Sequence, residues 1–97
     1  MSPPVTDDGT ALKTAWLQPL SRVFGGRTTT IRLTSATLRA RDGARFIEAL
    51  MPSNKKTNRY ASAVRVRVES PDGCFTGTVE RRENRPGERV LWIRVVS

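Results

Sequence analysis

The most regular alternation of apolar and polar positions opens the C-terminal third of the chain, where Val64, Val66 and Val68 alternate with Arg65 and Arg67. Successive side chains of a β-strand point to opposite faces of the sheet. The alternation therefore predicts a strand with one aliphatic face, suited to a core, and one face that carries fixed positive charge.

Two turn sequences divide this region into a meander of three antiparallel strands. The predicted strands span Tyr60–Glu69, Cys74–Glu83 and Arg89–Val96. Ser70–Gly73 reads Ser-Pro-Asp-Gly, which is typical of a type I turn. Arg85–Gly87 reads Arg-Pro-Gly and provides a glycine that tolerates a positive φ at the second turn.

Only one register keeps one face of the meander apolar, because a shift by one residue exchanges the two faces. With a three-residue second loop, the predicted pairs are Ser70–Gly73, Val68–Phe75, Val66–Gly77, Val64–Val79, Val79–Ile93, Arg81–Leu91 and Gly77–Val95. The apolar face would carry Val64, Val66, Val68, Phe75, Val79, Leu91, Ile93 and Val95. The opposite face would carry Arg65, Arg67, Thr76, Thr78, Glu80, Arg82, Trp92 and Arg94. Its cross-strand rows would be Arg65–Thr78–Arg94 and Ala63–Glu80–Trp92.

The N-terminal part shows a helical spacing of apolar residues. Thr10 is suited to cap the helix, Gly25-Gly26 to end it, and Pro19 to kink it. One stripe of the predicted helix contains Leu12, Trp16, Leu20, Val23 and Phe24. Residues 1–9, with two prolines, two aspartates and a glycine, are expected to form a flexible leader.

The middle of the chain is ambiguous. Arg27–Thr34 predicts a strand, and a change of parity after Ser35-Ala36 indicates a bulge or turn. Asp42-Gly43 is a two-residue hairpin signal. The spacing of Phe46, Ile47, Leu50 and Met51 instead favours a short helix over residues 43–51, which we take as the prediction. Ser53–Asn58 would then be a polar, basic loop.

These elements predict an α+β fold, in which an N-terminal helix packs on a bent antiparallel sheet of about five strands that ends in the three-stranded meander. If Asp42-Gly43 forms a hairpin, the variant is a small, partly open β-barrel. With 97 residues, positions 10–97 make a single small basic domain.

Composition narrows the possible functions. The chain has no histidine and one cysteine, so the usual general base, the commonest zinc ligand and an internal disulfide are all missing. We therefore predict no enzyme, metal or cofactor; the enzymatic alternative is a small ribonuclease that uses arginine with Glu80 or Glu83. No apolar stretch is long enough for a membrane span, and Met1–Pro4 lacks the basic start of a secretory signal, which predicts a cytoplasmic protein.

A net charge of +8 and a pI near 11.3 favour a polyanionic partner. We predict binding of DNA or RNA with little sequence specificity, by phosphate contacts and one aromatic stacking residue. The candidate residues are Arg65, Arg67, Thr78, Arg82, Trp92 and Arg94 on the sheet face, and Lys55, Lys56 and Arg59 in the loop. The same face would also suit an ordinary solvated surface, or one on which the N-terminal helix covers Trp92.

The second hypothesis is a protein-interaction module, or an accessory or inhibitor subunit that binds an acidic partner or forms a homodimer. Its contact surface would be the predicted helical stripe, with Leu12, Trp16, Leu20 and Phe24.

Overall fold

The structure is a computed structural model that describes residues 9–20 and 30–96. These residues form one eight-stranded antiparallel sheet in the order β1-β4-β5-β8-β7-β6-β2-β3. The strands are β1 (Thr10–Ala11), β2 (Trp16–Pro19), β3 (Ile31–Arg32), β4 (Ser35–Arg41), β5 (Ala44–Pro52), β6 (Arg65–Ser70), β7 (Gly73–Arg85) and β8 (Glu88–Val95). A 3₁₀ turn, η1 (Lys55–Thr57), and the short helix α1 (Asn58–Ala61) connect β5 to β6.

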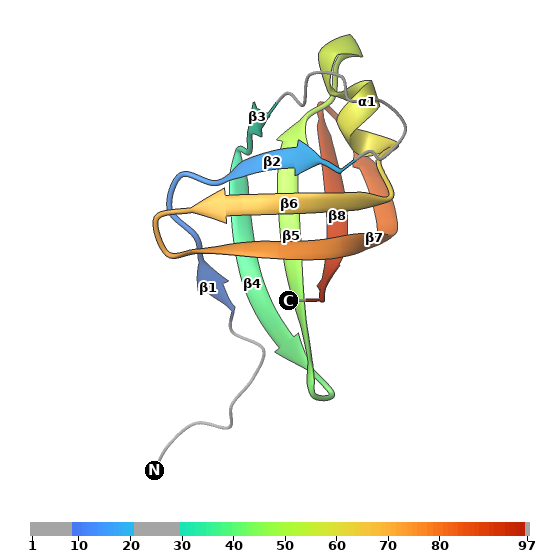
Figure 1. Cartoon of the computed structure of the whole chain (residues 1–97). Helices are drawn as coiled ribbons and strands as arrows, with labels where there is room; N and C mark the ends of the chain where they lie inside the picture. The colour runs from blue at the N-terminus through green and yellow to red at the C-terminus, as the bar shows by residue number, and fades with distance from the viewer. Residues whose placement is uncertain (1–8, 21–29, 97) are drawn as a thin grey trace.

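The sheet folds over on itself. In Figure 1, β2, β6 and the first part of β7 cross in front of β4, β5 and β8, and α1 lies at one end of the molecule. β7 belongs to both layers, and its pairing with β8 is irregular between Val79 and Arg81. This irregularity is a β-bulge at Glu80, and such a bulge bends a strand and increases its twist.

The core fills the space between the two layers. Burial of a large aliphatic side chain contributes roughly 1.5–3 kcal/mol, so the buried aliphatic residues of the core dominate the stability of the sheet. The large, fully buried apolar side chains of this core are Leu17, Ile47, Met51, Val66, Val68, Leu91 and Ile93. We call the side of the sheet that points away from this core the outer face.

The predicted N-terminal helix is wrong. Its first half forms β1 and β2. Ala15, just before β2, and Leu17 are buried, and the intervening Trp16 is exposed. This period of two is that of a strand. Pro19 is accommodated at the end of β2. The residues expected to complete the helix, 21–26, lie outside the described residues, as does the leader apart from Gly9.

The predicted strand Arg27–Thr34 is shorter in the structure. Only Ile31–Arg32 form β3, and residues 27–29 lie outside the described part. Leu33 is buried and donates its backbone N–H to the carbonyl of Ala15. The chain does break between two strands here, but the break lies at Leu33-Thr34 and the next strand begins at Ser35, so Ser35-Ala36 belong to β4.

The predicted helix over residues 43–51 is also wrong, because Asp42-Gly43 forms the two-residue turn of the β4–β5 hairpin. Arg41 pairs with Ala44, and both turn residues have positive φ, 51° at Asp42 and 81° at Gly43. Positive φ at both positions is the signature of a type I′ turn. Together with the strands at the N-terminus, this hairpin replaces the predicted α+β fold by a single sheet with β1 and β3 at its ends.

The polar segment after β5 is folded rather than a loop. Asn54 and Thr57 form a reciprocal capping box at η1, and α1 follows directly. Tyr60, predicted to begin a strand, lies in α1 and is buried, so β6 begins only at Arg65. Among the residues described, no helix has the length and apolar character needed to cross a membrane.

The register predicted for the first hairpin of the meander is confirmed by the pairs Ser70–Gly73, Val68–Phe75 and Val66–Gly77. On the predicted apolar face, Val66, Val68, Val79, Leu91 and Ile93 are buried, and Phe75 and Val95 are partly buried. Val64 is the exception, because it precedes β6 and is 63% exposed.

The second hairpin is predicted only in part. The pairs Gly77–Val95 and Val79–Ile93 are confirmed, but Arg81 pairs with Trp92 instead of Leu91. The loop has two residues, Pro86 and Gly87, between paired Arg85 and Glu88. The predicted loop had three residues. The loop in the structure has one residue fewer, and the extra residue lies instead in the bulge at Glu80.

Candidate functional site

A row of five paired residues crosses the outer face of five neighbouring strands, and we call it the arginine row. It contains Arg39 on β4, Phe46 on β5, Arg94 on β8, Thr78 on β7 and Arg65 on β6. The predicted row Arg65–Thr78–Arg94 is therefore confirmed, and the sheet extends it by two strands. Three guanidinium groups, one hydroxyl and one phenyl ring lie along a single line of the sheet.

A pocket of about 570 Å³ lies beside this row on the same face, and we call it the groove. Its lining combines guanidinium groups with two aromatic rings and one carboxylate: Arg39, Arg41, Phe46, Glu80, Arg81 and Trp92. The predicted row Ala63–Glu80–Trp92 is wrong, because Arg81 faces Trp92. Glu80 and Trp92 nevertheless share the groove.

The strand register brings the two aromatic side chains of the groove together. Phe46 pairs with Arg94, and Trp92 pairs with Glu48, so the two rings are diagonal neighbours on β5 and β8. Diagonal neighbours on one face of a sheet lie about 7–8 Å apart, within reach of aromatic side chains. Both residues are half-buried, and the described residues contain no helix over them.

The indole nitrogen of Trp92 is enclosed. Its Nε1 is inaccessible to solvent. It lies near enough to Glu83 to contribute, after Arg85, to the lowered pKa of that carboxyl group. The indole therefore offers its ring, rather than its N–H group, to the groove.

The bulge at Glu80 determines which arginine of β7 borders the groove. Beyond the bulge Arg81 points to the outer face, whereas Arg82 points toward α1. The Nε and Nη2 groups of Arg82 donate hydrogen bonds of 2.5 and 2.6 Å to the carbonyls of Ala61 and Ala63. Arg82, predicted as a binding residue, instead holds the end of α1.

Ion pairs neutralise part of the positive charge at the groove. Arg39 pairs with Glu48 at 3.1 Å, and Arg94 pairs with Glu80 at 3.5 Å. The Arg94–Glu80 pair is about half exposed, and such pairs contribute little to stability. Within the described part of the chain, Arg41, Arg65 and Arg81 make no ion pair or side-chain hydrogen bond.

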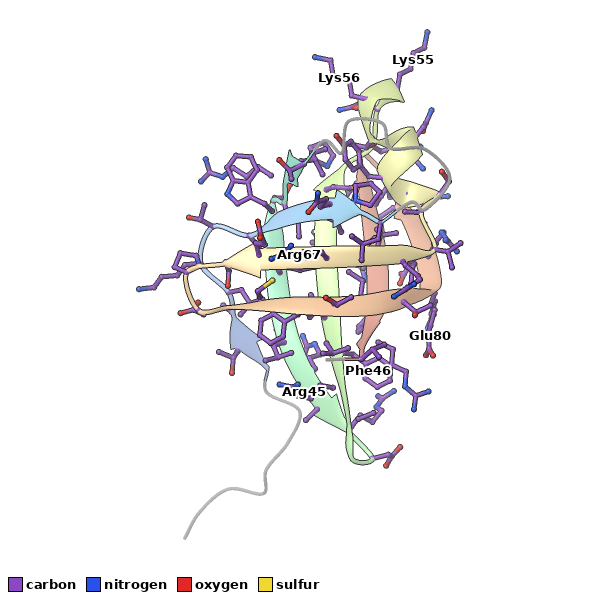
Figure 2. All side chains as sticks on the ribbon, viewed as in Figure 1. Arg45, Phe46, Lys55, Lys56, Arg67 and Glu80 are labelled. Carbon is purple, nitrogen blue, oxygen red and sulfur yellow. The ribbon has the colours of Figure 1, made fainter. Side chains whose placement is uncertain are left out.

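Arg67 is engaged elsewhere on the outer face. Its Nε donates to the thiol sulfur of Cys74 at 3.0 Å, and its Nη2 pairs with Glu69 at 3.1 Å. The hydrogen bond to Cys74 and the negative charge of Glu69 raise the pKa of Arg67. In Figure 2, Arg67 lies on β6, and Phe46 lies lower in the view toward the β4–β5 turn.

The predicted basic loop does not join the groove. Lys55 and Lys56 project at the α1 end, far from Phe46 in Figure 2. The side chain of Arg59 lies outside what the structure describes. Of the nine predicted binding residues, Trp92 lines the groove, and Arg65, Thr78 and Arg94 belong to the row beside it.

The apolar stripe of the second hypothesis is not formed. Leu12 belongs to the core and Leu20 is half-buried. Phe24 lies outside the described residues. Trp16 is 41% exposed and borders a separate small pocket near Cys74. The stripe therefore provides one described exposed side chain instead of a continuous surface.

Two features of the described residues bear on the ribonuclease alternative. The described residues contain no cluster of histidine, cysteine and carboxylate groups that would hold a metal ion. Glu83, a candidate base of the ribonuclease alternative, accepts a hydrogen bond from Arg85 at 3.2 Å, and this contact lowers its pKa. A lower pKa makes the carboxylate a weaker base near neutral pH.

No protein-family model, curated protein or solved structure matches this chain. The site is therefore interpreted from its own chemistry. Sequence reasoning missed Arg39, Arg41, Phe46 and Arg81. The Asp42-Gly43 turn was the available signal for the first three, because the hairpin places them on one face.

Proposed function

We propose that this protein is a non-catalytic nucleic-acid-binding protein that neutralises phosphates with the arginines of its outer face. The observation that supports this function is the arginine row with the groove beside it. Together they contain five arginines, Arg39, Arg41, Arg65, Arg81 and Arg94, and one glutamate, Glu80. With Glu48, the ion-pair partner of Arg39, included, positive charges exceed negative charges by three.

The aromatic rings favour nucleic acid over other polyanions. Guanidinium groups bind phosphate in any chemical setting. A half-buried phenyl ring and an indole beside them suit a partner that also has flat, apolar faces, as nucleic acids do. Phe46 and Trp92 meet this requirement on the same face as Arg41 and Arg81.

The proposal predicts a steep dependence of affinity on salt. Among the described residues Arg41, Arg65 and Arg81 form no ion pair, and the Arg94–Glu80 contact is long and exposed. If these four arginines neutralise about four phosphates of a single strand, the slope of log K against log salt is about −3. Fluorescence anisotropy of a labelled oligonucleotide at several salt concentrations measures this slope.

A matched pair of double variants separates the site from the overall charge. Arg41→Gln with Arg81→Gln removes two charges at the groove, and Lys55→Gln with Lys56→Gln removes two charges at the α1 end. The first variant should make the slope shallower by about 1.4, and the second should leave it nearly unchanged. Equal effects of the two variants, or no binding at low salt, would overturn the proposal.

A further inference from the structure

We infer that the groove selects single-stranded over double-stranded nucleic acid, because it holds an unstacked base against Phe46 and Trp92. This inference rests on the proposed function and adds the state of the strand and the position of the base. It assigns the aromatic pair to base contact and the arginines around it to the flanking phosphates.

The pattern of the sheet supports a ligand at the aromatic pair. Apolar side chains on the outer face of a sheet usually expose surface to water at no benefit to the core. Phe46 and Trp92 lie on that face, whereas their chain neighbours Ile47 and Ile93 point into the core. No described element covers Phe46 and Trp92. The two rings border a concave space rather than a flat surface.

The charges of the groove match a base with phosphates on either side. Arg41 and Arg81, which form no ion pair with another described residue, lie on β4 and β7, and Phe46 and Trp92 lie on the two strands between them. This order of strands places one guanidinium group on each side of the aromatic pair. A strand that crosses the groove would meet positive charge, aromatic rings and positive charge in turn.

A duplex is a poor fit to the same space. Paired bases expose only their edges, because their faces are stacked on each other, whereas a base of a single strand is free to stack on an aromatic ring. Sequence-reading proteins often insert a helix into the major groove. The one α-helix in the described residues, α1, has four residues, none of which lines the groove.

Intrinsic tryptophan fluorescence tests the position of the base. The chain contains two tryptophans, and Trp16→Phe leaves Trp92 as the single emitter at little cost, since Trp16 is 41% exposed. In this background a single-stranded oligonucleotide should quench Trp92. An abasic strand of the same length should bind more weakly and should quench much less.

Leucine variants test the strand preference. Phe46→Leu and Trp92→Leu remove a ring from the groove and should reduce single-strand affinity on the order of tenfold, with a small effect on duplex affinity. Phe75→Leu is the matched control, because it removes a partly buried ring that packs against the core and contacts Arg45. Urea unfolding of each variant checks that the fold is retained.

The outcomes distinguish this inference from the function on which it rests. Salt-dependent binding with equal affinity for single strands, duplexes and abasic strands would overturn the base-binding groove and leave the proposed function standing. Quenching of Trp92 by an abasic strand to the same extent would also overturn it. If no nucleic acid binds at low salt, the proposed function and this inference both fall.

Discussion

Arg81 lies opposite Trp92 across β7 and β8, although a regular ladder from the Val79–Ile93 pair would place Glu80 there. The bulge at Glu80 therefore has two effects. It bends β7 at the corner between the two layers, and it reverses the parity of the strand beyond that point. As a result, Arg81 borders the groove, and its neighbour Arg82 holds α1.

Deletion of Glu80 should destabilise the fold. The deletion preserves the pairs on both sides but removes the residue that lets β7 turn the corner, so we expect a loss of about 1–3 kcal/mol in the free energy of unfolding. Glu80→Gln retains the bulge and removes only an exposed ion pair with Arg94, and should change that free energy by less than about 0.5 kcal/mol. Urea unfolding measures both, and equal stabilities would contradict a structural role of the bulge.

The neighbours Arg81 and Arg82 should separate binding from stability. Arg82→Gln loses the hydrogen bonds to Ala61 and Ala63, and we expect a loss of about 1–2 kcal/mol in the free energy of unfolding. Arg81→Gln should leave stability within about 0.5 kcal/mol and weaken oligonucleotide binding. Each variant serves as the control of the other in urea unfolding and anisotropy. If Arg81→Gln instead lowered stability and Arg82→Gln weakened binding, the bulge would not determine which of the two arginines points to the outer face.

The C-terminal meander was predictable because its two faces differ in chemistry. Valines at alternate positions of β6 allow only one register with β7, and the structure has that register. The bulge was not predictable in the same way. A one-residue shift in the pairing of β7 with β8 can be accommodated either by a longer loop or by a bulge within the strand. Glu80, Arg81 and Arg82 are all polar, so neither arrangement would expose an apolar side chain, and the sequence does not distinguish them.

The two helical predictions failed for a different reason, which is that apolar residues occupy both faces of the strands. In β5 the buried Ile47 and Met51 alternate with Phe46 and Leu50 on the outer face. Strands with two apolar faces lose the period of two and resemble helices over short windows. The residue that obscured the strand, Phe46, is the one that lines the groove.

Gly77 should be intolerant of any side chain. It lies where β7 pairs with both β6 and β8, and a Cβ atom built on it would overlap the backbone carbonyl of Arg94 and approach Cγ2 of Ile93 to 2.6 Å. Because a backbone atom cannot move as a flexible side chain does, Gly77→Ala should destabilise the protein by about 1–3 kcal/mol. Thermal or urea unfolding measures this. Thr76→Ala, one residue away on the outer face, is the control and should be nearly neutral.

The acid dependence of stability should contain a contribution from Glu83. Arg85 donates a hydrogen bond to its carboxylate at 3.2 Å, and this contact, with the nearby positive charges, lowers the pKa of Glu83 below its ordinary value of 4.5. The folded protein therefore binds this proton less readily than the unfolded chain. The stabilisation is fully present above pH 4.5 and is lost as the pH falls below 4.5 through the folded-state pKa.

Urea unfolding as a function of pH tests this contribution. Glu83→Gln should lose less stability than the unmodified protein between about pH 5 and pH 3, because it has no carboxylate to protonate. Arg85→Gln should likewise reduce the loss of stability over this pH range, since it removes the main cause of the lowered pKa of Glu83. The double variant should then add little to either single change. If the free energy of unfolding fell equally steeply with decreasing pH in all four proteins, the Glu83–Arg85 contact would not persist in solution.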